Sequence, residues 1–373
     1  MNKLDLGTDR SPETEHVLIV GAGAIGRGFL APLLVKRGFK IHFADQATAL
    51  IQKFQQRPEN TYESAIALID GYVLQQVPYE RCYAMEEVEE ILPKINYIIF
   101  CVGIRELESA ASVIWSKLHK KNSLKAIYSV ENDYNSVKIL KDAFSKFDSI
   151  FFGVPDVITS SAAPAELQQI DPLCVVSEIG ELFLEGPYLK TAEETFSDTY
   201  VRTHWICKKY LHNTPHAAIA YLGAEKGHEY IHQACNDPDI EGVVTRLMDS
   251  ISYLLHGEYA LDQEFLSAYR VKELKRFKNS RLYDPISRVG RNPEIKLQAG
   301  ERIVHLANLQ TLYKQPTQDI SRVIAAALNY ADCDLFNAKK QDLSRAELLE
   351  DVCGISSDTL LGQQILESAI IYS

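Results

Sequence analysis

The sequence predicts an α/β fold, in which an N-terminal doubly wound sheet is followed by a mostly α-helical C-terminal domain. Three observations favour this fold. The apolar run VLIV continues directly into GAGAIG, short apolar runs alternate with helical patterns as far as residue 195, and helical periodicity dominates from His204 onward. We therefore expect a flexible leader over residues 1–15, a sheet domain over 16–195 and a helical domain over 196–373.

The expected elements of the sheet domain follow from the period of its apolar residues. We expect strands at 17–20, 40–45, 96–103, 125–130, 149–154 and 174–187, and helices at 27–38, 85–92, 105–119 and 134–146. Pro32 should kink the first helix, because proline lacks the N–H that a helix interior needs. We interpret residues 65–77 as two strands around Gly71, inserted into the alternating pattern.

The composition is that of a globular protein, and it excludes two classes. Hydrophobic residues make up 46% of the 373 residues, and the net charge of −11 argues against a nucleic-acid-binding surface. The chain has no run of about 18 apolar residues, so no membrane-spanning helix is expected. Its polar start is neither a signal nor a transit peptide. The 7 cysteines are dispersed without a C-x2-C pair, which indicates reduced thiols and a cytoplasmic location.

GAGAIG has the spacing G-x-G-x-x-G at Gly21, Gly23 and Gly26, directly after a strand and at the start of a helix. In this context the pattern indicates a Rossmann-type dinucleotide-binding domain. Gly21 permits a tight turn, Gly23 lets a pyrophosphate approach the backbone, and Gly26 allows helix and strand to pack closely. We expect the backbone of this loop, Ala24 and Ile25 included, to face the pyrophosphate at the helix N-terminus. The alternative is a glycine-rich turn that binds no ligand.

Three further residues belong to the expected cofactor site. Asp45 ends the second strand, 24 residues after Gly21, where a carboxylate can hold the ribose hydroxyls and repel a 2′-phosphate. The expected cofactor is therefore NAD rather than NADP. Val102 and Gly103 end a later strand and are expected to line the same crevice, although a plain turn would also account for this glycine.

The helical domain opens with CKKYLHNTPH, in which Lys208, Asn213 and His216 have the spacing K-x4-N-x2-H. On an α-helix Asn213 lies about 140° from Lys208 and His216 falls between them, so the three side chains share one broad face. Oxidation of a secondary alcohol needs a base that is neutral near working pH, and a buried lysine can supply it. Amide groups can donate to the developing alkoxide. The alternative is a solvated lysine pair beside a core histidine.

GAGAIGRGF, HNTPHAAIAYLG and RVGRNPEIKLQAGERI together resemble the polyol-specific long-chain dehydrogenases, also called the mannitol dehydrogenase family. The resemblance covers most of the chain, and its most specific part is K-x4-N-x2-H. It implies an oxidoreductase with an NAD domain and a helical catalytic domain, acting without a metal. It also implies that Lys208 is the general base, assisted by Asn213 and His216.

The resemblance implies two further site residues in the sheet domain. A second asparagine corresponds to Asn132 in SVENDYN, and an aspartate corresponds to Asp156 in VPDVITS. The sequence departs from the family pattern directly after this aspartate, because Val157 stands where an arginine is usual. This departure puts the identity of the substrate in doubt.

The resemblance implies a reaction that interconverts a sugar-alcohol phosphate and a ketose phosphate, and the pair we expect is D-mannitol 1-phosphate and D-fructose 6-phosphate. A phosphate is best held by arginine, and RVGRNP supplies Arg288 and Arg291. The alternative for these arginines is a structural role in which they bond loop carbonyls. A related hexuronate reductase or free-polyol dehydrogenase is the alternative function. We expect a monomer that acts on small molecules.

Residues 228–232 raise a hypothesis from another class, because HEYIH has the pattern H-E-x-x-H. In a zinc metalloprotease His228 and His232 would share one helix face as ligands, with Glu229 as the base. No third ligand is marked, and the glycine fingerprint would have no explanation. A third hypothesis, an NAD-binding protein without activity, conflicts with the presence of Lys208 and Asn213.

Overall fold

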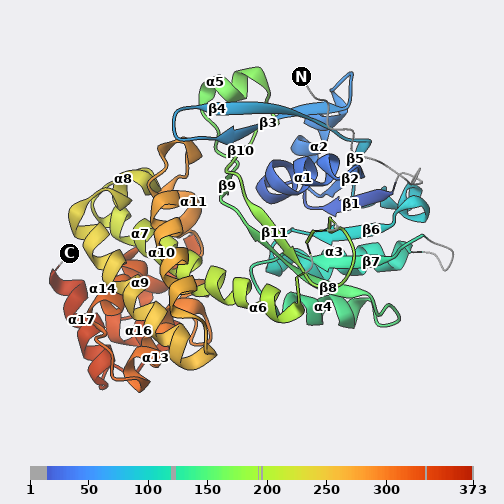
Figure 1. The fold of residues 1–373 in the computed structure, drawn as a ribbon. Helices are drawn as coiled ribbons and strands as arrows, with labels where there is room; N and C mark the ends of the chain where they lie inside the picture. Colours follow the sequence, from blue (N-terminus) through green and yellow to red (C-terminus); the bar gives the residue numbers. More distant parts are fainter. Residues whose placement is uncertain (1–14, 119–122, 192, 195, 332–333, 372–373) are drawn as a thin grey trace. The chain divides into compact units, whose positions relative to one another are not determined.

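The computed structural model describes residues 15–118, 123–191, 193–194, 196–331 and 334–371 (Figure 1). It divides between Val201 and Arg202 into two compact units, somewhat beyond the boundary expected at 195/196. Nearly all of the expected leader lies outside the described residues. Within the described ranges, no helix combines the length and the apolar character needed to cross a membrane.

A seven-stranded sheet forms the core of the first unit, with the order β11-β8-β7-β6-β1-β2-β5 (Figure 1). Its strands are β1 (His16–Val20), β2 (Lys40–Asp45), β5 (Arg81–Ala84), β6 (Tyr97–Phe100), β7 (Ala126–Ser129), β8 (Ile150–Asp156) and β11 (Glu181–Leu184). Neighbours pair in parallel except β11, which runs antiparallel to β8. Residues 17–20 of β1 are fully buried, as expected for a strand covered on both faces. The predicted doubly wound α/β class is confirmed.

The register of the sheet brings the carboxyl ends of its central strands to one edge. Val20 of β1 pairs with Ala44 of β2 and with the last residue of β6. Gly21, Asp45 and Cys101 therefore follow at the same edge. In open α/β sheets this edge is where ligands bind.

Helices and short 3₁₀ turns connect these strands: α2 (Thr48–Gln55), η2 (Val88–Glu90), η3 (Leu92–Lys94), α3 (Ile104–Lys117) and α4 (Ser136–Ala143). The α-helix expected at 85–92 is wrong, because η2 and η3 occupy the end of that segment instead. Pro93 cannot donate to the carbonyl four residues earlier, which favours the tighter 3₁₀ turns over a continued α-helix.

The helix after the glycine loop begins with a π-helical segment. η1 (Gly26–Leu30) is a π-helix, and α1 (Ala31–Lys36) continues it. The N–H of Ala31 donates to the carbonyl of Gly26, five residues back. Pro32 has no N–H, and in an α-helix its ring would crowd the carbonyl four residues earlier. A wider π turn before it relieves that crowding. The kink expected at Pro32 stays a prediction.

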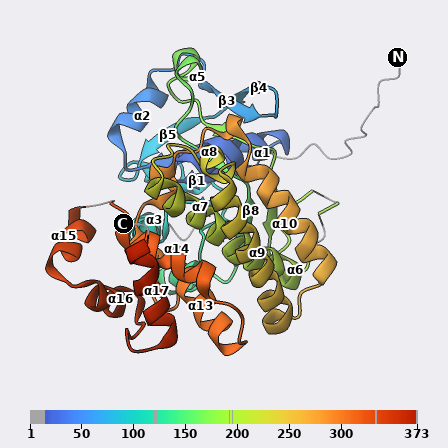
Figure 2. The same ribbon diagram turned by 90° about the vertical axis from the view of Figure 1, so that its left-hand side faces the viewer.

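A smaller four-stranded sheet, with the order β4-β3-β10-β9, also belongs to the first unit. Its strands are β3 (Thr61–Ala67), β4 (Tyr72–Pro78), β9 (Thr159–Ser160) and β10 (Val176–Ser177). β3 and β4 form the antiparallel pair expected around Gly71. Helix α5 (Ala165–Ile170) lies beside this pair in Figures 1 and 2.

The second unit is helical throughout its described length, apart from turns and one isolated bridge. Its elements are α6 (Asp198–Cys207, which spans the division), η4 (Lys208–His212), α7 (Asn213–Glu225), α8 (Ile231–Cys235), α9 (Pro238–Tyr259), α10 (Gln263–Phe277), η5 (Ser280–Leu282), α11 (Ile286–Gly290), α12 (Pro293–Lys296), α13 (Arg302–Leu312), α14 (Gln318–Asn329), α15 (Asp334–Asp342), α16 (Arg345–Cys353) and α17 (Leu360–Ile371). α7 is central, because residues 214–223 are all buried and it packs against α8, α9, α11 and α14.

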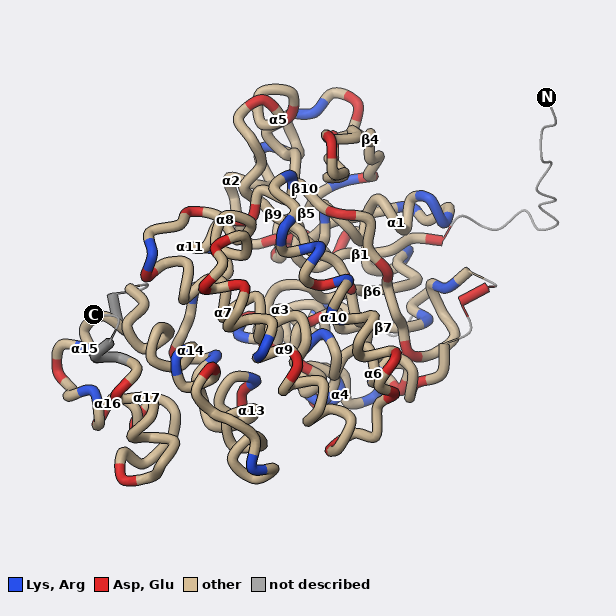
Figure 3. Tube along the Cα trace, turned by 60° about the vertical axis from the view of Figure 1, so that its left-hand side comes forward, with Lys and Arg blue, Asp and Glu red and all other residues tan. Residues whose placement is uncertain are grey.

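Charged side chains of both signs are mixed along the chain. Figure 3 shows Lys and Arg interspersed with Asp and Glu over the described trace. A nucleic-acid-binding surface usually gathers its basic residues on one face or stripe.

Candidate active site

The three glycines of the fingerprint have different surroundings. Gly21 has φ +104°, and a Cβ there would lie 2.7 Å from the carbonyl oxygen of Cys101. A Cβ on Gly26 would lie 2.2 Å from the carbonyl oxygen of Gly21. A Cβ on Gly23 would meet no atom within 4 Å. The fold itself therefore requires glycine at the first and third positions, whereas the second faces open space.

The carboxylate of Asp45 is bonded to the glycine loop. Its Oδ2 accepts the N–H of Ala22 at 2.8 Å, and its Oδ1 accepts the N–H of Ala47 at 2.8 Å. A pocket of about 260 Å³ begins at this carboxylate. It is lined by Gly21, Gly23, Ala44, Asp45, Gln46, Met85, Glu86, Cys101, Val102, Glu106, Ser109, Ala110 and Val113. Ala24, Ile25, Gly26 and Gly103 are absent from this lining.

Gly103 lies between Val102, which lines this pocket, and the start of α3. It has φ +91°, a conformation that favours glycine, and it immediately precedes α3. Its N–H donates to the Oε1 of Glu131 at 2.9 Å. Glu131 is buried at 8% exposure, and its neighbour Asn132 is exposed. Glu131 thus links the loop after β6 to the loop after β7.

Lys208 and Asn213 belong to a π-helical turn, which corrects the α-helical geometry expected from the sequence. η4 covers Lys208–His212, and the N–H of Asn213 donates to the carbonyl of Lys208, five residues back. An i→i+5 turn places the fifth residue one turn beyond the first, so their backbones stack on one side of the helix. The separation of about 140° expected for an α-helix is therefore wrong. Lys208 is 7% exposed and Asn213 is half-buried.

A proline again follows the π turn. Pro215 has no N–H to donate to Leu211, and in an α-helix its ring would crowd that carbonyl. The hydroxyl of Thr214 donates to the carbonyl of Lys209 at 3.3 Å, a side-chain bond that also spans five residues. Single π turns occur often at functional sites, and this one brackets the two residues of K-x4-N.

His216 is held by a buried carboxylate. Its ring is 7% exposed, and its Nε2 lies 2.8 Å from the Oδ2 of Asp284. Arg288 bonds the other oxygen of Asp284 from Nε at 2.7 Å and from Nη2 at 2.6 Å. Burial alone would raise the pKa of Asp284, but Arg288 and His216 together lower this pKa below its ordinary value. The carboxylate is thus kept ionised inside the helical unit.

Asn132 and Asp156 lie in the first unit, in the loop after β7 and at the end of β8 respectively. Asp156 is buried at 4% exposure. Val157 is also buried and belongs to the apolar core of that unit. A Cβ on Gly180 would lie 2.5 Å from the Cβ of Val157. The position is therefore packed closely as an apolar one, whereas an arginine there would need a partner for its charge.

The two arginines proposed for a phosphate have different surroundings. Arg288 is already engaged with Asp284 through two of its nitrogens. Arg291 is exposed directly after α11, and it forms no ion pair within the part of the chain that the structure describes. Its carbonyl accepts a hydrogen bond from the Nζ of Lys296. Arg291 is thus the arginine whose side chain is available to an anion.

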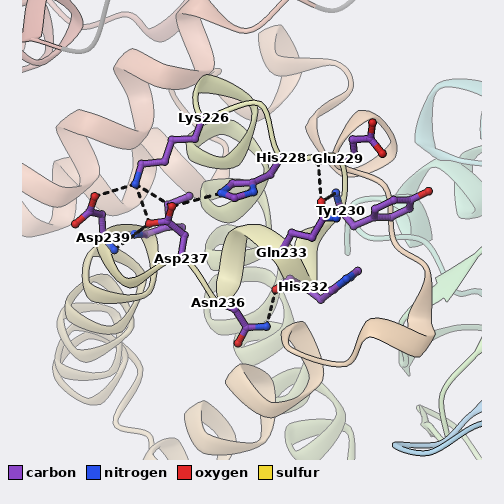
Figure 4. Close-up of polar contacts among 10 residues, drawn as sticks. Lys226, His228, Glu229, Tyr230, His232, Gln233, Asn236, Asp237 and Asp239 are labelled. Carbon is purple, nitrogen blue, oxygen red and sulfur yellow. Dashed lines mark hydrogen bonds and ion pairs between the residues drawn. The ribbon is translucent and has the colours of Figure 1, made fainter.

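HEYIH does not form one helix face (Figure 4). α7 ends before Gly227, which has φ +76°, and α8 begins only at Ile231. The Nε2 of His228 lies 3.4 Å from the Oδ2 of Asp237, whereas the ring of His232 stacks on Tyr230 with centroids 5.8 Å apart. Among the described residues, no cluster of three or more possible metal ligands occurs. The helical arrangement that a zinc protease requires is contradicted.

Two residues of these networks were not singled out from the sequence. Glu131 directly precedes Asn132, and Asp284 stands four residues before Arg288. An acidic residue and an arginine four apart predict an ion pair on a helix surface. The same spacing gives no sign that the carboxylate is buried or that a histidine from another helix shares it.

Two family models match the chain. The Mannitol dehydrogenase Rossmann domain matches residues 15–176, and the Mannitol dehydrogenase C-terminal domain matches residues 202–352. The chain belongs to the mannitol dehydrogenase family. It is therefore an oxidoreductase of the polyol dehydrogenase class, and the expected resemblance is confirmed.

Relatives of this mannitol dehydrogenase family member match most of its length. A protein of Thermoanaerobacter pseudethanolicus named mannitol-1-phosphate 5-dehydrogenase is 30% identical over 319 residues, or 78% of this chain and 79% of that one. A Bacillus pumilus protein of the same name is 30% identical over 367 residues, or 93% and 97% of the two chains. The solved Pseudomonas fluorescens mannitol 2-dehydrogenase, a ternary complex with NAD and D-mannitol, has a TM-score of 0.75 and 15% identity. It covers 96% of this chain and 91% of its own, and at this identity it supports the fold alone.

Proposed function

We propose that this protein is an NAD-dependent dehydrogenase that interconverts a sugar-alcohol phosphate and a ketose phosphate, with D-mannitol 1-phosphate and D-fructose 6-phosphate as the pair. The observation that carries the proposal is the similarity over nearly the whole chain to relatives named mannitol-1-phosphate 5-dehydrogenase. The π turn that stacks Lys208 and Asn213 supports it at the level of residues.

The residues at the edge of the parallel sheet fit NAD. Gly23 leaves open space where a pyrophosphate can approach the backbone. Each oxygen of Asp45 accepts one backbone N–H, and a carboxylate offers about four acceptor sites, so two are left for ribose hydroxyls. A 2′-phosphate would meet the same negative charge, which favours NAD over NADP. When bound, the cofactor supplies the redox chemistry, as a hydride acceptor (NAD⁺) for alcohol oxidation and a hydride donor (NADH) for ketose reduction.

The remaining chemistry is assigned to side chains of this chain. Lys208 accepts the hydroxyl proton as the alcohol is oxidised, and returns it when the ketose is reduced. Its burial disfavours a charged amine, which suits this task. The amides of Asn213 and Asn132 donate to the alkoxide that develops on the substrate. His216 bonds a substrate hydroxyl.

The assignment of the other site residues follows their surroundings. Asp156, buried at the end of β8, is proposed as a further polar residue of the site. Arg291 is proposed as the first contact of the substrate phosphate, because its side chain is exposed. Arg288 is a weaker candidate for this contact, because Asp284 already holds it.

The proposal is tested by following NADH oxidation with D-fructose 6-phosphate, D-fructose and D-fructuronate in parallel. A charge-assisted contact contributes about 1.5–3 kcal/mol, so kcat/KM should favour fructose 6-phosphate over fructose by roughly 10- to 150-fold. Arg291→Ala should remove most of this preference without changing the KM for NADH. Equal kcat/KM for the two ketoses would refute a phosphate contact, and turnover of fructuronate alone would indicate a hexuronate reductase.

A further inference from the structure

Two histidines of the helical unit each bond a buried carboxylate, and an arginine bonds each of these carboxylates in turn. His216 bonds Asp284 through Nε2, and Arg288 holds that carboxylate. The Nδ1 of His212 lies 2.5 Å from the Oε2 of Glu273, and Arg276 bonds Glu273 at 2.5 Å. The two imidazole rings are 5.2 Å apart, and the ring of Phe277 contacts both. The two sets are similar in chemistry but hold opposite ring nitrogens.

The Asp284 set determines which nitrogen of His216 carries the proton. An ionised carboxylate can only accept hydrogen bonds, so the Nε2 that faces it must be protonated. Arg288 donates to the other oxygen and keeps the carboxylate charged. The Nδ1 of His216 has no hydrogen-bond partner among the described residues. In the neutral ring, Nδ1 is then a hydrogen-bond acceptor.

We propose that Asp284, clamped by Arg288, is a positioning residue that fixes His216 in the Nε2–H tautomer, so that Nδ1 accepts a hydrogen bond from a hydroxyl of the substrate. This inference rests on the proposed function and deepens it. It makes His216 a determinant of specificity for a substrate that carries a hydroxyl near the reacting carbon. It also gives Arg288 a role distinct from holding a phosphate.

Asp284→Asn is the most informative variant, because it changes the tautomer without removing volume. Arg288 is only a donor, so it must take the amide oxygen of the new side chain. The amide NH2 then faces the Nε2 of His216 and can only donate to it. His216 is forced into the Nδ1–H tautomer, which cannot accept from a substrate hydroxyl. The KM for fructose 6-phosphate should rise and kcat/KM should fall by about 10- to 100-fold, the size expected when the substrate hydroxyl is left without an acceptor.

Glu273→Gln is the matched control. It alters a buried carboxylate that also pairs with a histidine and an arginine in the same core. It should lower the unfolding temperature as Asp284→Asn does, yet leave kcat/KM within a few-fold of wild type. An equal loss of kcat/KM in the two variants would mean that Asp284 acts only through the stability of the core.

A panel of ketose phosphates, each lacking one hydroxyl, shows whether Asp284→Asn loses one specific contact of His216 or is generally less active. If His216 Nδ1 accepts from one hydroxyl, the analogue that lacks this hydroxyl should be used equally by wild type and Asp284→Asn. The other analogues should keep the full difference in kcat/KM. The proposal would be overturned if the kcat/KM of wild type exceeded that of Asp284→Asn by the same factor for every analogue.

The tautomer itself can be measured without turnover, which separates this proposal from the proposed reaction. ¹⁵N NMR of the histidine rings in the full chain, assigned with His216→Gln, should show wild-type His216 protonated on Nε2 with an unprotonated Nδ1. A proton on Nδ1 of the neutral wild-type ring would overturn the proposal even if Asp284→Asn does not fold. If His216 shows the Nε2–H signal but the protein turns over no ketose phosphate, the tautomer proposal holds and the proposed substrate is wrong.

Discussion

Lys208 and Lys209 are neighbours in sequence with different surroundings. Lys208 is buried, whereas the Nζ of Lys209 lies 5.6 Å from the ring centroid of Trp205 and 5.5 Å from that of Tyr210. The ammonium of Lys209 is thus engaged with two aromatic rings. The two lysines therefore offer a comparison that depends on position alone.

Lys208→Ala should keep the fold and bind NADH normally, because the glycine loop lies in the other unit. Turnover should fall by about 10²–10⁴-fold, the usual contribution of a positioned acid–base group. Added primary amines should restore part of the rate, since the missing group is an amine. Steady-state kinetics and a separate NADH titration measure the two effects.

Lys209→Ala is the control for this prediction. Loss of its contacts with Trp205 and Tyr210 should cost some stability, but kcat should stay within a few-fold of wild type. Equal losses of kcat in the two variants would leave the assignment of the base without support. Near-normal turnover in Lys208→Ala would refute it.

Asp45 is expected to set the choice of cofactor. The wild type should favour NAD over NADP in kcat/KM by at least about tenfold, or ~1.4 kcal/mol. Asp45→Ala removes the negative charge and should narrow this ratio. It also removes the acceptor for the N–H groups of Ala22 and Ala47, so NAD should bind more weakly as well. Kinetics with both cofactors test this, and a wild type that prefers NADP would contradict it.

At the scale of the element, helix irregularity marks the limit of what the sequence predicts. Lys208 and His216 of K-x4-N-x2-H are both buried, and their catalytic roles stay predictions. The α-helical wheel misplaced Asn213, because apolar periodicity cannot reveal one extra residue in a turn. The signal that was present is proline: Pro32 and Pro215 each follow a π segment. Proline after a helix start is therefore the residue pattern that accompanies both π segments.

The glycine loop gives a test at the same scale. Gly23→Ala should leave the unfolding temperature nearly unchanged, because a Cβ there meets no atom within 4 Å, yet it should weaken NAD binding where the pyrophosphate approaches. Gly26→Ala should lower stability by about 1–3 kcal/mol, because its Cβ would overlap a backbone carbonyl that cannot move aside easily. Thermal unfolding and NADH titration of both variants measure this. A larger loss of stability in Gly23→Ala than in Gly26→Ala would contradict the packing described here.

HEYIH shows how a local motif misleads when one helix ends before it and the next begins only within it. The N–H groups of Gly227 and His228 close the end of α7 on the carbonyls of Ala224 and Gly223. A glycine in this left-handed position is a common helix stop, so Gly227 indicates in the sequence that the helix ends before His228. His228 is directed to Asp237 instead of sharing a face with His232 (Figure 4).

We therefore expect the purified protein to contain no stoichiometric zinc. Chelators should leave turnover intact, and His228→Ala should keep kcat within a few-fold, because the motif does not form a helical ligand pair. Elemental analysis and kinetics check this. One zinc per chain that disappears in His228→Ala would revive the hydrolase hypothesis.

At the scale of the whole molecule, the two-domain organisation was predictable because the spacing of apolar residues changes along the chain, from alternating strand and helix patterns to helix patterns alone. Strand runs alternating with helices and a later stretch of helical periodicity are properties of many residues together, and one misassigned element such as 85–92 does not alter them. The buried pairing of His216 with Asp284 joins residues 68 positions apart in sequence. No local pattern encodes such a contact, so the structure was needed to find it.

The chain has 2 tryptophans, Trp115 in the first unit and Trp205 in the second, which allows the units to be followed separately. In Trp205→Phe the fluorescence of Trp115 reports the unit with the glycine loop, and Trp115→Phe reports the helical unit. NAD⁺ at about 100 times its Kd should stabilise the binding unit by ~2.7 kcal/mol. NAD⁺ should therefore raise the urea concentration at the unfolding midpoint more for the transition reported by Trp115 than for the one reported by Trp205. At the same NAD⁺ concentration Gly23→Ala should reduce the shift. A shift confined to Trp205, or one of unchanged size in Gly23→Ala, would place the cofactor elsewhere.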